Sequence, residues 1–140
     1  MVPIDSGFDP IIGALNTSLN LRLTNQNVIS SNIANADTPG YKAKTMEFEG
    51  ALRDALNVGN GLQAAGSDPQ HIVHRSTDSV APEIYDDPNG VESLDGNTVD
   101  RASEMAKMAE NQLLYDASAE MIKRKLGMLK YAISEGGGNH

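Results

Sequence analysis

The side chains of this 140-residue chain most able to do chemistry are two histidines, His71 and His74, which lie three residues apart. Imidazole nitrogens at such spacing can bind a divalent transition metal, but a protein metal site needs further ligands. The surrounding sequence is typical of a loop and offers no clear third ligand, and the chain has no cysteine. We therefore predict no metal site and no cofactor, and we interpret both histidines as solvated polar residues.

Other ion-binding or catalytic patterns also fail on spacing. The acidic stretch 86–95 does not fit the calcium-loop pattern Asp-x-Asp/Asn-x-Asp/Asn-Gly. No set of serine, histidine and aspartate has a strained turn to present a nucleophile, and no glycine-rich phosphate loop follows a predicted strand. We predict that the chain has no catalytic residues and is not an enzyme.

Charge and composition exclude further classes of protein. The net charge of −8 is concentrated in residues 67–100, where Arg75 stands against eight acidic side chains. Such a middle segment cannot neutralise phosphates, which excludes a nucleic-acid binder. It is either a solvated connector or a docking surface for a basic partner. The N-terminus has no basic stretch, and no apolar run approaches the ~20 residues of a membrane span, so we expect any export to need no Sec-type signal peptide.

Two long helical patterns flank this acidic middle, the first over about residues 10–36 and the second over about residues 98–134. Each pattern carries two apolar stripes rather than one, which predicts burial against more than one neighbour. Arg22 and Gln26 lie inside the main stripe of the first helix, so its packing is not purely apolar. The candidate helix-packing residues are Leu15, Leu19, Ile29, Leu113, Met121 and Met128.

The segment between the helices is irregular. Residues 46–56 suggest a short strand-like piece followed by a brief helix, and Ile72-Val73 and Glu83–Tyr85 are candidate short strands between turns rich in Gly, Pro, Asp and Asn. Asn97 is predicted to be the N-cap of the second helix, with Asp100 at its third position in a capping box. The predicted fold is all-α, with the long N- and C-terminal helices packed as an antiparallel, coiled-coil-like pair beside a small irregular middle segment.

The first helical pattern ends at a defined place. Pro39 cannot continue a helix and pushes Thr38 towards an extended conformation, and Gly40 supplies the positive φ that a type II turn needs after a proline. The amides of Asn32 and Asn35 can donate to the last helical carbonyls or to an adjacent helix. We divide the chain into residues 1–40, an N-terminal export and assembly segment with its helix; residues 41–97, a connector with a short helix and loops; and residues 98–140, a C-terminal helix with a flexible tail.

The string N32-I-A-N-A-D-T-P-G-Y-K42 closely resembles the signature that follows the N-terminal helix in the rod and hook axial proteins of the bacterial flagellum. Three further segments resemble the proximal-rod branch of that family: M46-E-F-E-G-A-L52, S93-L-D-G-N-T-V-D100 and E104-M-A-K-M-A-E-N-Q-L-L-Y115. FlgC-type rod proteins fit less well, because they usually carry an insertion before the tyrosine. The residues that the resemblance assigns to the signature turn and to assembly are Asn32, Ile33, Asn35, Thr38, Pro39, Gly40 and Tyr41.

The resemblance implies a structural subunit of the proximal rod of the flagellar basal body, exported by the flagellar type III secretion apparatus and polymerised through its terminal helices as part of the motor drive shaft. It implies a location in the rod, on the periplasmic side of the inner-membrane ring. The implied partners are FlgC-type and FlgF-type rod proteins, the rod adaptor FliE, other copies of the chain and, transiently, the export gate. It implies no nucleic acid and no small-molecule substrate.

Two points stay open at the level of sequence. Phe8 and Ile12 resemble the Phe-x-x-x-aliphatic motif that the export gate reads, yet Phe8 could equally pack beside the start of the first helix. The alternative function is a cytoplasmic helical adaptor or export chaperone of the flagellar system. The signature turn and the two-stripe helices favour the rod subunit, because a chaperone needs one groove rather than packing on several sides.

Overall fold

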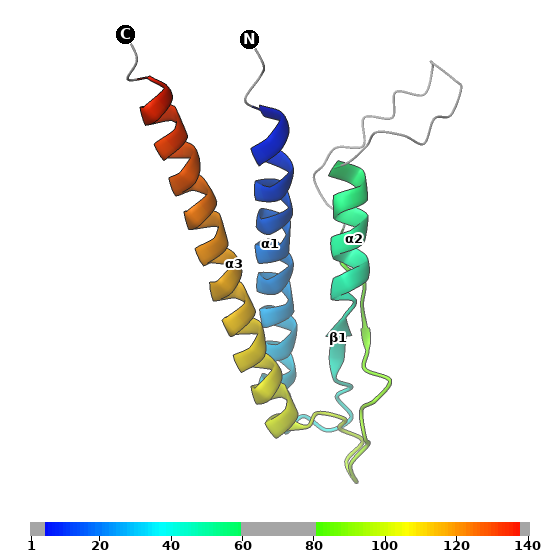
Figure 1. Cartoon of the computed structure of the whole chain (residues 1–140). Helices are drawn as coiled ribbons and strands as arrows, with labels where there is room; N and C mark the ends of the chain where they lie inside the picture. The colour runs from blue at the N-terminus through cyan, green and yellow to red at the C-terminus, as the bar shows by residue number, and fades with distance from the viewer. Residues whose placement is uncertain (1–4, 60–80, 138–140) are drawn as a thin grey trace, which may run out of the picture.

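The computed structural model describes the backbone of residues 5–59 and 81–137 and the side chains of residues 11–56 and 81–137. The elements in chain order are α1 (Asp5–Ala34), β1 (Lys44–Met46), α2 (Phe48–Gly59), β2 (Ile84–Asp86) and α3 (Arg101–Gly136). Figure 1 shows α1 and α3 as an antiparallel pair with α2 on the other side of α1. The predicted fold class, two long terminal helices packed together beside a small middle segment, is confirmed.

The two long helices lie closest where α1 ends and α3 begins, and they diverge towards the two chain termini (Figure 1). The only buried side chains of α3 are Glu104 and Asn111, both in its first third. The predicted packing residues Leu113, Met121 and Met128 are exposed, so α1 does not cover them. Among the described residues, no helix combines the length and the apolar character needed to cross a bilayer.

The middle segment contains a small antiparallel sheet. β1 pairs with β2 in a register that places Lys44 opposite Asp86 and Met46 opposite Ile84, and the Lys44 ammonium forms an ion pair with the Asp86 carboxylate. The strand-like piece and the strand predicted at residues 83–85 therefore exist, with bounds shifted by one or two residues. The other strand candidate, Ile72-Val73, lies outside the described residues.

A small apolar core joins α1 to β1 and α2. Leu21, Met46 and Ala51 are buried together, and Phe48 packs against them. The guanidinium carbon of Arg22 lies 4.3 Å from the centroid of the Phe48 ring, a cation–π contact that holds α2 to α1.

The two apolar stripes predicted for α1 are buried unequally. Leu21 and Val28 form the second stripe and are buried, whereas Leu23, in the main stripe with Arg22 and Gln26, is 49% exposed. Ile29 is the buried member of the main stripe, and Leu15 and Leu19 are half-buried. The cause is tertiary, since α2 and β1 cover one side of the helix and α3 covers only part of the other.

The predicted starts of both long helices are wrong. α1 begins at Asp5 rather than near Pro10. Pro10 lies inside the helix, where its missing N–H and its ring leave the Ser6 carbonyl without the usual helical hydrogen bond. α3 begins at Arg101 rather than Thr98, because Asp100 and not Asn97 is its N-cap. The ends at Ala34 and Gly136 differ from the predicted ends by two residues, within the ordinary scatter of helix boundaries.

The divergence of the helix pair predicts uneven stability along α3. A helix segment with few buried contacts opens at low free-energy cost, and Met121, Leu126, Met128 and Ile133 are all about half exposed or more. In the free chain we expect amide hydrogens of α3 beyond residue 120 to exchange roughly a hundredfold faster than those around Asn111, or faster still. Hydrogen exchange followed by mass spectrometry measures this ratio. Uniform protection along α3 would contradict the uneven packing.

Candidate functional site

The predicted turn after α1 is present. The Tyr41 N–H donates to the Thr38 carbonyl at 3.2 Å, which closes a four-residue turn with Pro39 and Gly40 at its centre. Gly40 has a φ of 73°, the left-handed value that a type II turn requires at this position. The chain therefore leaves α1 at a fixed angle and enters β1.

Asn32 is the centre of the site and has an exposed fraction of 0%. Its amide nitrogen donates to the Lys44 carbonyl at 2.7 Å and to the Glu104 carboxylate at 2.9 Å. Its amide oxygen accepts from the Tyr41 hydroxyl at 3.1 Å and from the Lys44 N–H at 2.9 Å. The side chain thus uses its full hydrogen-bonding capacity to connect α1, the turn, β1 and α3.

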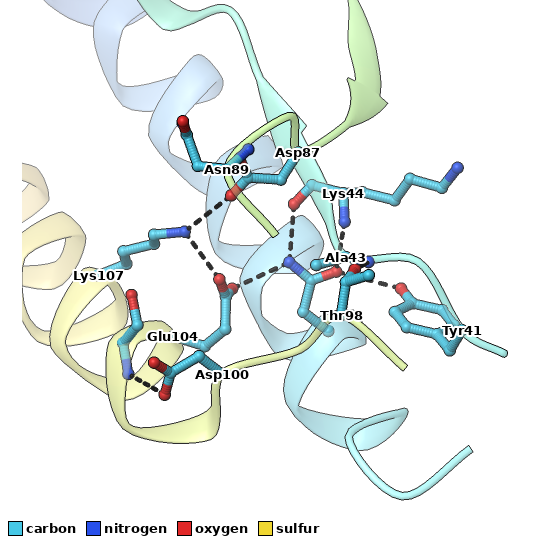
Figure 2. A network of polar contacts seen from close by, with 11 residues as sticks. Tyr41, Ala43, Lys44, Asp87, Asn89, Thr98, Asp100, Glu104 and Lys107 are labelled. Atoms are coloured by element: carbon cyan, nitrogen blue, oxygen red, sulfur yellow. Dashed lines mark hydrogen bonds and ion pairs between the residues drawn. The ribbon is translucent and has the colours of Figure 1, made fainter. Parts of the chain in front are cut away.

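Figure 2 shows how the network continues from Glu104 to Lys107 and Asp87. Glu104 is only 3% exposed, and the Lys107 ammonium lies 2.8 Å from its carboxylate and 3.5 Å from that of Asp87. Burial by itself lowers the pKa of Lys107, but the hydrogen bond and charge of Glu104, together with Asp87, raise it overall. The lysine is therefore charged at neutral pH, and the buried carboxylate has the positive partner that such a group requires.

The loop that leads into α3 runs alongside the turn and is bonded to it. The Gly40 N–H donates to the Asp95 carbonyl at 2.8 Å, and the Thr98 N–H donates to the Tyr41 carbonyl at 3.0 Å. The Thr98 hydroxyl accepts from the Ala43 N–H at 2.8 Å. Segments more than fifty residues apart in sequence are thus held together, and we call the whole set, residues 31–44, 93–98 and Glu104, the joint.

Asn97 is not the N-cap of α3, contrary to the sequence prediction. Its side chain is buried and donates to the carbonyls of Asn35 at 2.9 Å and Thr38 at 2.8 Å, so it covers the exposed carbonyls that follow α1. The N-cap is Asp100, whose carboxylate accepts from the Ser103 N–H at 3.1 Å. The amide oxygen of Asn97 accepts from the Val99 N–H at 2.7 Å and so closes a local turn, and α3 begins at Arg101, three residues later than predicted.

The remaining signature residues lie at the surface of the joint. The Asn35 amide donates to the Ser31 carbonyl at 2.8 Å, so the predicted bonds from the two amides are both present, one to a carbonyl of α1 and one, through Asn32, to α3. Ile33 is half-buried and Pro39 is exposed.

A second buried polar contact joins the helices two turns away. The amide nitrogen of Asn111, which is 4% exposed, donates to the Arg22 carbonyl and to the Gln26 side-chain oxygen, both at 2.9 Å. Its amide oxygen accepts from the Asn25 amide at 3.2 Å. The prediction that packing around Arg22 and Gln26 is not purely apolar is confirmed.

The other predicted sites fall mostly away from the joint. Ile12 is half-buried within α1, while the side chain of Phe8 lies outside the described side chains. His71 and His74 also lie outside the described residues. In the part of the chain that the structure describes, no group of three or more His, Asp or Glu side chains is placed to hold a metal ion.

Local sequence pattern indicates no special role for Glu104 or Asn111, and it places Asn97 at the start of α3 rather than against the turn after α1. A weak signal for the first two exists, because Asn25 and Asn32 are seven residues apart, as are Glu104 and Asn111. Polar residues that recur at heptad spacing within a helical pattern indicate a shared seam rather than a solvated face.

Comparison with known proteins gives the site its context. The family model described as Flagella basal body rod protein matches residues 14–42, most of α1 and the whole signature turn. A flagellar basal body rod protein FlgB from Cereibacter sphaeroides is 38% identical over 128 residues, which cover 91% of this chain and 97% of the relative. The FlgB proteins of Aeromonas hydrophila and Salmonella typhimurium are 37% and 34% identical over 124 and 117 residues.

Those two matches cover 88% and 80% of this chain, and 92% and 85% of the respective relatives. Similarity of this size extends over nearly the whole of each protein, so it includes both long helices and is not confined to the signature. The resemblance drawn from residues 32–42 is therefore confirmed by independent matches. The chain belongs to the FlgB family of flagellar basal body rod proteins.

Proposed function

We propose that this chain is a structural subunit of the proximal rod of the flagellar basal body, polymerised through its terminal helices as part of the motor drive shaft. In this role it has no substrate, and its function is to hold a fixed shape between neighbours and to transmit torque. The family of the chain supports the proposal, because its relatives are named as basal body rod proteins.

The observation that carries the proposal is the uneven burial of α3. Along its 36 residues only two polar side chains are buried, whereas Leu113, Met121, Met128 and Ile133 are between 55% and 69% exposed. A soluble monomer rarely leaves a run of large apolar side chains in water. The exposed apolar side chains of α3 then form a surface for other chains, as expected of a subunit that packs into a tube.

The proposal includes the location and the partners expected from the sequence. The chain would be made in the cytoplasm, exported by the flagellar type III apparatus, and assembled on the periplasmic side of the inner-membrane ring. Its neighbours there would be other copies of itself, FlgC-type and FlgF-type rod proteins and the adaptor FliE.

Fractionation tests this proposal. A strain that carries a tagged copy of the chain is lysed, and basal bodies are purified through detergent and salt washes. We expect the chain to remain with intact basal bodies, since subunits buried in a tube do not wash off. Recovery from the cytosol alone would contradict the rod role and would favour the alternative, a cytoplasmic adaptor or export chaperone.

The export proposal makes a separate prediction. If the secretion gate reads Phe8 and Ile12, changing both to alanine should lower secretion at least about tenfold, which corresponds to roughly 1.4 kcal/mol of lost recognition, with the cytoplasmic level unchanged. Ile11→Ala is the matched control, because Ile11 is an adjacent aliphatic residue outside the motif. Secretion of the double variant at the wild-type level would assign both residues to helix packing instead.

A further inference from the structure

The contact between α1 and α3 has an unusual composition. Where these helices meet, the buried residues of α3 are a glutamate and an asparagine, and both of them bond to asparagines of α1. Leu113, Met121, Met128 and Ile133 of α3 are exposed, whereas Met108, Tyr115, Ile122 and Leu129 are half-buried. The contact therefore combines half-buried apolar side chains with two fully buried polar groups, and the polar groups are the ones that need particular partners.

The two polar contacts fit one register of the helices. Asn25 bonds to Asn111 and Asn32 bonds to Glu104, so a step of seven residues along α1 matches a step of seven back along α3. A slip of one heptad in one direction would place Asn25 opposite Glu104 and leave Asn32 beyond the start of α3. A slip in the other direction would leave the Glu104 carboxylate beyond the end of α1. Either shift would leave buried polar groups without hydrogen-bond partners, which raises the free energy of the helix pair.

We propose that the contacts at Asn111 and Asn32 determine the partner and the register of α1, so that α1 pairs with α3 of its own chain. An apolar seam would bind any exposed apolar helix at several registers, and every copy of this chain exposes such a helix along α3. Buried asparagines at helix interfaces restrict pairing to the arrangement that satisfies them, at a cost in stability. The apolar face of α3 then stays available for contacts between chains. This inference concerns the single chain and does not depend on the proposed function.

Asn111→Leu in the full-length chain tests the inference. Because the chain has no cysteine, spin labels can be attached at engineered cysteines replacing Asn20 and Ala117, which are exposed on α1 and α3. In the wild-type chain we expect a monomer by light scattering and one distance by pulsed electron resonance. In Asn111→Leu we expect species heavier than the monomer and a second, longer distance, because a heptad slip at ~1.5 Å per residue moves the two labelled positions about 10 Å apart along the helix axis.

Two further variants complete the test. Gln112→Leu adds the same side chain at the neighbouring, exposed position and should behave as wild type, because among the described residues the Gln112 side chain bonds only to Asp116 of its own helix. Asn25→Leu removes one of the three hydrogen bonds of Asn111 and leaves those to Arg22 and Gln26, so it should show the same effect in a weaker form. The inference is overturned if Asn111→Leu keeps a single mass and a single distance, or if Gln112→Leu changes the mass and the distance as much as Asn111→Leu does. It is also overturned if the wild-type chain itself shows several distances, or if both asparagine variants simply lose their helices.

Discussion

Asn32→Leu is expected to destabilise the folded chain by about 3–5 kcal/mol, because it leaves several buried polar groups without partners at about 1–3 kcal/mol each. The leucine would leave the Glu104 carboxylate with Lys107 alone, and it would leave the N–H and carbonyl of Lys44 without partners. The free energy of unfolding of a domain is typically only about 5–15 kcal/mol, so this variant would lose a large part of it. Denaturant unfolding followed by circular dichroism measures the change.

Asn35→Leu is the matched control, because the same substitution three residues later removes a half-buried amide whose hydrogen bonds are exposed. Asn35 bonds through its side chain to Ser31 and Thr38 within the same turn of the chain, and surface bonds of this kind contribute about 1 kcal/mol or less. The expected order is wild type, then Asn35→Leu, then Asn32→Leu, with the larger gap at Asn32. Equal losses at the two positions would show that Asn32 is not the centre of the joint.

Gly40→Val is expected to block completion of the rod and to abolish swimming, while expression and export remain intact. A Cβ at this position would meet no atom within 4 Å, so the cost comes from the backbone, whose φ of 73° a β-branched residue resists by roughly 1–2 kcal/mol or more. Relief of that strain would rotate the peptide whose N–H bonds to Asp95. In an assembly the displaced turn would recur in every subunit.

Gly40→Asn separates backbone strain from the addition of a side chain. Asparagine tolerates the left-handed region far better than valine does, so this variant should assemble rods and swim nearly as the wild type does. Asn35→Leu should impair assembly more mildly than Gly40→Val. Counts of complete basal bodies by electron microscopy, with swimming in soft agar, give the comparison. Normal swimming of the Gly40→Val strain would show that the turn does not need a fixed angle.

The features predicted correctly from the sequence are those fixed by local chemistry. Helical periodicity alone locates both long helices, and Pro39 followed by Gly40 dictates the turn whatever surrounds it. The two short strands and the short helix α2 follow from short apolar runs between turn residues. Each of these depends on residues within a few positions of one another, which is the range over which sequence patterns carry information.

The misjudged features depend on residues far apart in sequence. Asn97 and Asp100 are both good N-caps by type, but Asn97 donates to the Asn35 and Thr38 carbonyls and its oxygen accepts from Val99, whereas Asp100 caps α3. Glu104 resembles a solvated glutamate in a helix until Asn32 and Lys107 are brought beside it. Exposure of apolar residues along α3 was likewise not predictable, because it depends on how far α1 and α3 diverge (Figure 1).

Electron microscopy of basal bodies from a strain that lacks this chain tests the proposed rod role most directly. Basal bodies are purified from the deletion strain, from the same strain with the wild-type gene restored, and from the strain with the Gly40→Val gene. We predict rings without a rod in the deletion strain, complete rods with the wild-type gene, and incomplete rods with Gly40→Val. Complete rods in the deletion strain would contradict the account, since a structural subunit of the rod cannot be absent from a finished rod.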